Sequence, residues 1–427
     1  MTWQNWGRTQ RADPRRTLGP AGVPEICEIV SAAAHSGTTV KTVGASHSFS
    51  GIAVPRDTLV RLTNLRGLIG VDGDRATVRA GTHLYEIPAL LAPHGLAMAN
   101  LGDINKQTLA GATSTGTHGT GRRFGGISTQ IVAMELVDGT GEVRQIDQPA
   151  ELQSAALGLG ALGIITAITL QCVPSFSIEA IEGPARIDDV LSTLDGAVQD
   201  NDHFEFYWFP HTDAALTKRN RRIEGLVAPS GPGRVRGYID DELLSNIVFG
   251  TLCRTGAVLP AAVPLINQIT GHALSGRTTV DSSASVFTSD RKVRFREMEY
   301  AVPLDRVAEA FDRIRKVILD KRYRISFPVE VRMAAADDLM MSTASGRPSA
   351  YLAVHRYAGD PLDNYFTDVE AEMVTLGGRP HWGKMHTRDA GYLRTVYPRF
   401  DEFVAVRNQW DPHRVFANDY LDQVLGP

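Results

Sequence analysis

Cysteine is nearly absent from this chain of 427 residues. The three cysteines, Cys27, Cys172 and Cys253, are odd in number and far apart, and no C-x-x-C pair occurs. This pattern excludes a disulfide framework and a cysteine-based zinc site of the usual kind. We therefore expect three reduced core thiols in a reducing compartment.

The chain also lacks an excess of charge of either sign. Lys and Arg together number 44, and Asp and Glu together number 48, which gives a formal net charge of −4. A chain without a basic field gives no indication of binding to nucleic acid or to an anionic membrane surface.

Long apolar runs are missing as well. The longest candidate, residues 256–266, is short and is broken by Pro260 and Pro264, which suits a buried helix and turn better than a membrane span. Residues 1–6 show no basic stretch followed by an apolar one, so we expect no secretory signal. The combined expectation is a cytoplasmic enzyme without a membrane span, with peripheral contact to a membrane left open.

Glycine, in contrast, is abundant, with 40 residues. Up to about residue 173, strand patterns, including a hairpin signal at Asp72-Gly73, alternate with helical patterns. Beyond Pro174, strands with period-two alternation are separated by helical stretches. These strands cover residues 203–209, 296–302, 328–333 and 351–357. The pattern predicts an α+β protein whose second domain is an antiparallel sheet flanked by helices.

A glycine motif at residues 158–163, with the sequence GLGALG, matches G-x-G-x-x-G letter for letter. In nicotinamide dinucleotide folds, this fingerprint needs a strand before it and a helix after it. Here a helical pattern precedes the motif, and the strand pattern of residues 164–170 follows it. We therefore interpret these glycines as a turn, or as the wall of another cofactor site.

Two other loops consist almost entirely of small residues. Residues 111–121 read GATSTGTHGTG, and residues 43–49 read VGASHSF. Such segments bring backbone amides and hydroxyls close to a phosphate or a flat ring. Taken singly, each loop is also compatible with a surface turn.

Together with Gly102-Asp103 and Gln107-Thr108, these loops resemble the FAD-binding half of the vanillyl-alcohol-oxidase, or PCMH-type, flavoprotein family. Two C-terminal segments, residues 381–384 (HWGK) and 416–420 (FANDY), resemble its sugar-lactone oxidase branch. That branch includes gulonolactone, arabinonolactone and galactonolactone oxidases and the related alditol oxidases. The resemblance covers essentially the whole chain.

The resemblance implies a two-domain PCMH-type fold. An FAD-binding domain would cover residues 1–176, a substrate-binding cap residues 177–380, and a C-terminal segment, residues 381–427, would return to the FAD domain.

The resemblance also implies a cofactor site. In this family the histidine of the first loop commonly carries the flavin through a bond to its 8α carbon, which raises the redox potential, and His47 matches that position. Where many members have Gly or Arg before it, this chain has Ser46. The other matching cofactor positions are Val43, Gly44, Ala45, Ser48, Gly102, Asp103, Thr108, Gly111, Ala112, Thr115, Gly116, His118, Gly119, Gly163, Ile164, His381 and Lys384.

Side chains two residues apart on a strand share one face and lie about 6.6 Å apart, at roughly 3.3 Å per residue. Glu330 and Arg332 therefore point the same way, as do Tyr351, Ala353 and His355 on the next predicted strand. From the residues alone, Glu330 and Arg332 are also compatible with a surface ion pair. The resemblance favours a substrate site, because these oxidases use a Glu-x-Arg pair, a histidine and the H-W-G-K lysine around the substrate.

The resemblance therefore implies five substrate-binding residues: Thr108, Glu330, Arg332, His355 and Lys384. Of these, it implies that Glu330, Arg332, His355 and Lys384 are also catalytic. A fixed cation such as Lys384 would stabilise the negative charge that hydride transfer places on the flavin. We expect His355 or Arg332 to assist removal of the hydroxyl proton. His381 and His386 invite a metal site, but their spacing fits no helical ligand pair and the sequence shows no third partner, so we expect no metal.

The sequence thus predicts an FAD-dependent oxidoreductase that oxidises a secondary hydroxyl of an L-gulono-1,4-lactone-like sugar lactone by hydride transfer to flavin N5. Oxygen, a cytochrome or a quinone would take up the electrons. An alditol oxidase acting on xylitol or sorbitol fits the same motifs. A catalytically silent flavin- or sugar-binding protein is the alternative from another class.

Overall fold

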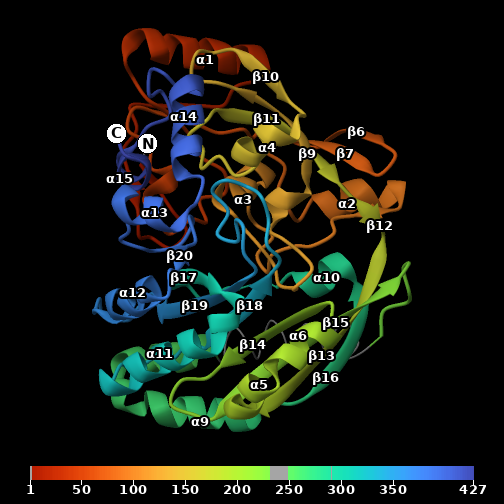
Figure 1. Cartoon of the computed structure of the whole chain (residues 1–427), viewed down its shortest axis with the longest axis vertical. Coiled ribbons are helices and arrows are strands. Elements are labelled where there is room, and N and C mark those ends of the chain that lie inside the picture. The colour runs from red at the N-terminus through yellow and green to blue at the C-terminus, as the bar shows by residue number, and fades with distance from the viewer. Residues whose placement is uncertain (1, 231–248, 290) are drawn as a thin grey trace.

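The computed structural model describes residues 2–230, 249–289 and 291–427 of the chain. Figure 1 shows these residues as an upper and a lower half, each built around its own main sheet, with both chain ends in the upper half. Helices and mostly antiparallel strands alternate along the chain, which confirms the predicted α+β class.

The upper half holds a five-stranded antiparallel sheet in the order β10-β9-β11-β7-β6 and a three-stranded parallel sheet in the order β3-β5-β4. Their strands are β3 (Arg16–Leu18), β4 (Val40–Thr42), β5 (Thr58–Val60), β6 (Leu68–Asp72), β7 (Arg75–Arg79), β9 (Ile131–Val137), β10 (Val143–Ile146) and β11 (Ile164–Gln171). Two short pairs complete this half: β1 (Trp3–Gln4) with β2 (Arg11–Ala12), and β8 (Leu96–Ala97) with β12 (Val173–Pro174).

The helices of the upper half come from both ends of the chain. They are α1 (Val23–Ser36), α2 (Ile87–Leu91), α3 (Leu109–Thr115), α4 (Pro149–Ala155), α13 (Ala390–Val396), α14 (Phe400–Trp410) and α15 (Asp419–Leu425). Phe403 of α14 and Val424 of α15 are fully buried in the same apolar core as Ile26 of α1. Burying a side chain of this size contributes roughly 1.5–3 kcal/mol. The last segment of the chain is therefore part of the core of the upper half.

The predicted turn at residues 158–163 is confirmed. It connects α4 to β11, and Leu159 and Gly160 both have a positive φ, of 57° and 62°. A strand therefore follows the glycines, as predicted, and not the helix that a dinucleotide fingerprint requires.

The lower half is an eight-stranded antiparallel sheet in the order β16-β13-β15-β14-β18-β19-β17-β20. Its strands are β13 (Phe176–Arg186), β14 (His203–Trp208), β15 (Ala214–Glu224), β16 (Arg277–Ser282), β17 (Phe295–Pro303), β18 (Val329–Ala334), β19 (Ser349–Tyr357) and β20 (Arg379–Pro380). Its helices are α5 (Ile187–Ser192), α6 (Leu194–Asp200), α8 (Phe249–Val258), α9 (Val263–Ala273), α10 (Ser283–Phe287), α11 (Val307–Asp320) and α12 (Tyr365–Thr375).

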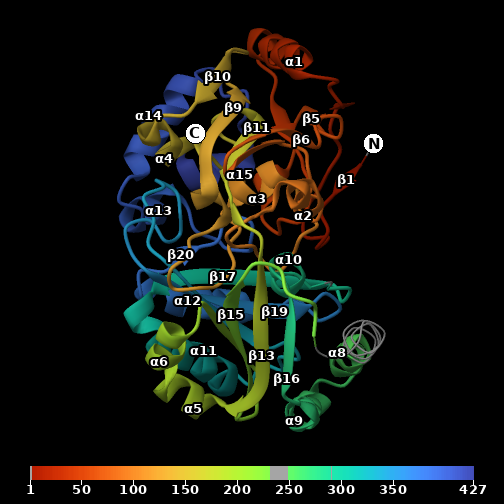
Figure 2. The ribbon, with the colours of Figure 1, turned by 90° about the vertical axis from the view of Figure 1, so that its right-hand side faces the viewer.

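Period-two alternation gives the large sheet two different faces. Val331 of β18 and Val354 of β19 point into the core beneath the sheet, where they pack with Phe311 and Ile314 of α11. Because side chains alternate, Glu330 and Arg332 of β18 and His355 of β19 point to the opposite face, which is polar at these positions. Figure 2 shows β17 and β20 at the junction of the two halves. The polar face of the sheet is thus turned toward the upper half.

In the part of the chain that the structure describes, no helix has both the length and the apolar character that crossing a membrane would require.

Candidate active site

The larger of two adjoining cavities, with a volume of about 300 Å³, is walled by residues of the upper half. Most of the predicted cofactor positions line it: Val43, Gly44, Ala45, Ser46, His47, Ser48, Thr108, Gly111, Thr115, Gly163 and Ile164. Lys41 and Arg61 line it as well, whereas none of the described lining residues is Asp or Glu. A guanidinium, hydroxyls and backbone amides without a carboxylate suit a dinucleotide diphosphate. These residues therefore fit FAD.

The loop after β4 approaches α3 so closely that Gly44 has no room for a side chain. A Cβ at Gly44 would lie 2.2 Å from Oγ1 of Thr108. Thr108 is the N-cap of α3, and its hydroxyl accepts a hydrogen bond from the backbone N–H of Gly111 at 3.3 Å. Thr108, predicted to contact substrate, thus lines the cofactor cavity and fixes the start of α3.

Three predicted cofactor positions lie outside both cavities. Ala112 is fully buried in the core of the upper half. Gly116 ends α3 with a φ of 78°, and Gly119 packs against the carbonyl of Leu101, where a Cβ would lie 2.2 Å from the oxygen. These residues shape the loop that surrounds the site.

The smaller cavity, of about 70 Å³, lies between the two halves. It brings together the remaining predicted residues from both of them: Gly102, Asp103, His118, Glu330, Arg332, His355, His381 and Lys384. His47 and Ser48 line both cavities. A flavin held in the larger cavity and reaching His47 would therefore border the smaller one.

His47 is a neutral imidazole at this junction. Burial, reinforced by the charge of Lys384, lowers its pKa to about 4. Its ring stacks on Trp6, with 5.6 Å between centroids. Ser46 before it has a φ of 60°, and two hydrogen bonds hold it there: Nε1 of Trp3 donates to its hydroxyl at 3.0 Å, and N of Trp6 to its carbonyl at 2.8 Å.

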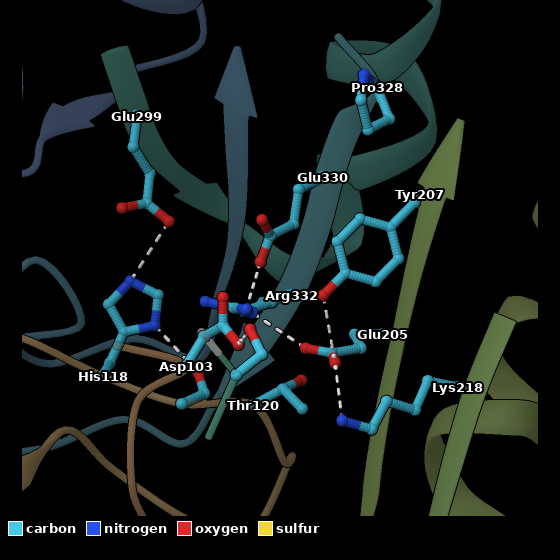
Figure 3. A network of polar contacts seen from close by, with 12 residues as sticks. Asp103, His118, Thr120, Glu205, Tyr207, Lys218, Glu299, Pro328, Glu330 and Arg332 are labelled. Atoms are coloured by element: carbon cyan, nitrogen blue, oxygen red, sulfur yellow. Dashed lines mark hydrogen bonds and ion pairs between the residues drawn. The ribbon is translucent and has the colours of Figure 1, made fainter. Parts of the chain in front are cut away.

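Arg332 lies between two carboxylates on the polar face of the large sheet (Figure 3). Its Nε donates to Glu205 at 2.8 Å, and its Nη2 forms an ion pair with Glu330. Tyr207 also donates to Glu205, at 3.2 Å, and Lys218 lies 3.8 Å from it. Burial raises the pKa of Glu330. In Glu205, the charges of Arg332 and Lys218 outweigh burial and lower the pKa.

A second ion pair extends this network across the junction of the halves. Arg291, in the segment before β17, lies 2.6 Å from Asp103 of the upper half and 3.6 Å from Glu330. The backbone N–H of Ser289 donates to the carbonyl of Asp103 at 3.0 Å. Asp103, predicted as a cofactor contact, therefore also ties the upper half to the residues around Glu330.

Two carboxylates of β17 line the same cavity. Glu297 forms an ion pair with Lys384, and Oε1 of Glu299 lies 3.3 Å from Nε2 of His118. Burial opposes ionisation of Glu299, but the charge of His118 outweighs it, and the pKa falls to about 2. Each carboxylate thus faces a basic residue that the sequence predicted.

His118, Glu299 and His381 have ligand atoms within 4.8 Å of one another, a combination that could hold a metal ion. The hydrogen bond of His381 argues against its use as a ligand. Nδ1 of His381 accepts the backbone N–H of Gly383 at 3.0 Å, so the proton of the neutral ring is on Nε2. Nδ1 of His118 donates to the carbonyl of Gly119 at 2.8 Å, which leaves its Nε2 for Glu299. We interpret the group as an ion pair with a neighbouring histidine.

Sequence reasoning did not identify four charged residues of this polar network: Glu205, Arg291, Glu297 and Glu299. A signal for the last two is visible in the sequence. In the predicted strand 296–302, both carboxylates fall on the face opposite Met298 and Tyr300, which are buried in the core beneath the sheet. Two acidic side chains on one face of a buried strand require cationic partners.

Comparison with known proteins agrees with this geometry. The family described as D-arabinono-1,4-lactone oxidase matches residues 168–424, and the FAD binding domain matches residues 14–147. L-gulono-1,4-lactone dehydrogenase of Mycobacterium tuberculosis is 40% identical over 427 residues, which cover 100% of this chain and 99% of the relative. L-gulonolactone oxidase of Bos taurus is 30% identical, over 100% of this chain and 98% of the relative.

A solved structure of cholesterol oxidase from B. sterolicum superposes with a TM-score of 0.81 over 100% of this chain and 96% of that one, at 18% sequence identity. That likeness concerns the fold alone; together with the match to the FAD binding domain, it confirms the predicted fold class. Because one family matches more than half of the residues and relatives match the full length, the chain belongs to the D-arabinono-1,4-lactone oxidase family and carries its FAD-binding domain.

Proposed function

We propose that the protein is an FAD-dependent oxidoreductase that oxidises a secondary hydroxyl of an aldonolactone resembling L-gulono-1,4-lactone. The observation that supports this most directly is the smaller cavity, where Glu330, Arg332 and Lys384 meet beside His47. Carboxylate, guanidinium and ammonium groups recognise the hydroxyls and the carbonyl of a lactone. The matched relatives are lactone enzymes by name, which favours a lactone over an open-chain alditol.

When bound, FAD supplies the acceptor for the hydride that leaves the substrate carbon. The residues of this chain would bind the lactone, exclude water and receive the hydroxyl proton. Lys384 is mostly buried, with 19% of its side chain exposed. A cation fixed in such a site stabilises negative charge that develops during the reaction.

Glu330 fits the role of proton acceptor better than the two residues that the sequence suggested. Burial alone would lower the pKa of Arg332, but Glu330 and Glu205 outweigh it and raise the pKa, so the guanidinium keeps its protons. In His355, one ring nitrogen is hydrogen-bonded to the carbonyl of Pro328 at 3.2 Å, and the other faces Glu297. Both nitrogens therefore already have partners within the protein. Burial moves the pKa of Glu330 toward neutral pH, as general-base catalysis requires.

The test of this function is anaerobic reduction of the bound flavin. We expect L-gulono-1,4-lactone to bleach the visible flavin absorbance at least roughly 100-fold faster than xylitol or sorbitol, because the loss of well-placed hydrogen bonds costs several kcal/mol. Faster bleaching by the polyols would identify an alditol oxidase. A flavin that no lactone or polyol in a broad panel reduces would identify a binding protein.

We further propose that His47 carries the flavin through a bond from its ring to the 8α carbon. The low pKa of His47 leaves a nitrogen lone pair available for such a bond at neutral pH. Acid precipitation of the wild-type protein should therefore leave the yellow colour in the pellet, and precipitation of His47→Ala should release it to the supernatant. Release from the wild type would contradict the bond while leaving the oxidoreductase function intact.

A further inference from the structure

The carboxylate of Glu297 lies between two of the predicted catalytic residues. Its Oε2 forms an ion pair with Nζ of Lys384, and its Oε1 lies 3.6 Å from Nε2 of His355. Only 7% of the Glu297 side chain is exposed. Burial opposes its ionisation, but the charges of Lys384 and His355 outweigh burial and hold the pKa of Glu297 well below its usual range.

The fold brings these three residues together from separate segments. Glu297 and His355 are direct partners in the antiparallel pair of β17 and β19, so their side chains are neighbours on one face. The segment that carries Lys384 runs beside β17, because the backbone N–H of Met385 donates to the carbonyl of Glu297 at 2.9 Å. The ring of Phe49 lies 5.6 Å from Nζ of Lys384. The long side chain of Lys384 is thus held between a carboxylate and an aromatic ring.

The two oxygens of Glu297 have different partners. Nδ1 of His355 donates to the carbonyl of Pro328 at 3.2 Å, so the ring turns its Nε2 toward Oε1 of Glu297. Lys384 occupies Oε2. An amide in place of the carboxylate has one acceptor oxygen and carries no negative charge. Glutamine can therefore accept a hydrogen bond from Lys384 but cannot form the ion pair that holds its ammonium.

We propose that Glu297 is a positioning residue of this active site: it fixes the ammonium of Lys384 and the imidazole of His355 at their places on the cavity wall. Its catalytic consequence rests on the proposed lactone oxidation. Its effect on the bound flavin, transmitted through Lys384, does not depend on the substrate.

A double-mutant cycle tests the proposal. Contacting residues show coupling of roughly 0.5–3 kcal/mol, which is a factor of about 2 to 150. We expect Glu297→Gln to lower kcat by roughly 10- to 100-fold with less than about a threefold change in KM, within that range. Glu297→Asp, which keeps the charge, should recover part of the loss. In a Lys384→Met background, Glu297→Gln should lower kcat by a clearly smaller factor than in the wild-type background, because one of the two residues through which it acts is gone.

The same set of variants is used for a second double-mutant cycle. Its measured quantity is the midpoint potential of the bound flavin in the absence of lactone. Glu297→Gln should shift the potential by different amounts in the wild-type and Lys384→Met backgrounds, because part of its effect on the flavin is transmitted through Lys384. A wild-type protein that oxidises no lactone would contradict the proposed function, whereas this second cycle would still decide the role of Glu297. If Glu297→Gln does not fold, Glu297→Asp is carried through both backgrounds instead.

Glu370 provides a matched control. It is also a buried carboxylate, and it accepts hydrogen bonds from Tyr300 and Thr387 on the other side of β17. Any loss of kcat in Glu370→Gln should be the same factor in the wild-type and Lys384→Met backgrounds. Equal losses in both backgrounds for the Glu297 variants, with additive shifts of the midpoint potential, would show that Glu297 has only a structural role and would overturn the proposal.

Discussion

Replacing Glu330 with glutamine is expected to lower kcat by roughly 10²- to 10⁴-fold, the usual contribution of a positioned proton acceptor. The FAD content should stay unchanged, because Glu330 lines the smaller cavity and not the one that fits the dinucleotide. Steady-state kinetics with the lactone, together with the ratio of flavin to protein absorbance, measures both quantities.

The pH dependence of kcat gives an independent check on this variant. A base acts in its ionised form, so the rate should rise as the pH increases through the pKa of Glu330. Burial raises that pKa, so the acid limb of the profile should lie at a higher pH than the ordinary pKa of a glutamate would give. The limb should be absent in Glu330→Gln. As a control, Glu309→Gln on the exposed side of α11 should retain the wild-type profile. A Glu330→Gln variant with near wild-type rates would contradict the assignment.

Regular alternation made much of the lower half predictable from the sequence. The predicted strands 203–209, 296–302, 328–333 and 351–357 correspond to β14, β17, β18 and β19. A strand with one buried face fixes which side chains share the other face, so Glu330 and Arg332 could be placed together without coordinates. The small-residue loops were equally informative, since the close approach of Gly44 to Thr108 permits no side chain.

Pairing between distant segments could not be predicted in the same way. Glu205 meets Arg332 only because β14 lies beside β18, and β14 lies 127 positions earlier in the chain. Arg291 belongs to an irregular segment, where no periodicity indicates direction. Local pattern determines the face on which a residue lies, whereas the order of strands in the sheet determines its partner, and one sequence does not encode that order locally.

Replacing Arg332 with methionine is expected to have the largest effect on stability. Arg332 is 12% exposed and lies between Glu205 and Glu330, so its removal leaves two buried carboxylates without their central cation. Breaking a buried pair in this way costs about 3–5 kcal/mol in the free energy of unfolding. Activity should fall in parallel, since Arg332 lines the cavity. Urea unfolding of the FAD-loaded protein measures the loss of stability.

The loss of stability in Arg332→Met should also depend on pH, and the structure determines the direction of this dependence. Arg332 is the main cation that lowers the pKa of Glu205, so the ionised carboxylate stabilises the folded protein. This stabilisation is present above the carboxylate pKa of the unfolded chain. It disappears as the pH falls through the pKa of Glu205 in the folded protein. Without Arg332, the folded protein must bury ionised carboxylates at high pH, but it can protonate them at low pH. The destabilisation of Arg332→Met should therefore be larger at pH 8 than at pH 5, taken as points above and near the usual carboxylate range. Arg332→Lys, which keeps the charge but loses the forked geometry, should lose less. Equal losses for both variants at both pH values would show that packing, and not charge, is what Arg332 contributes.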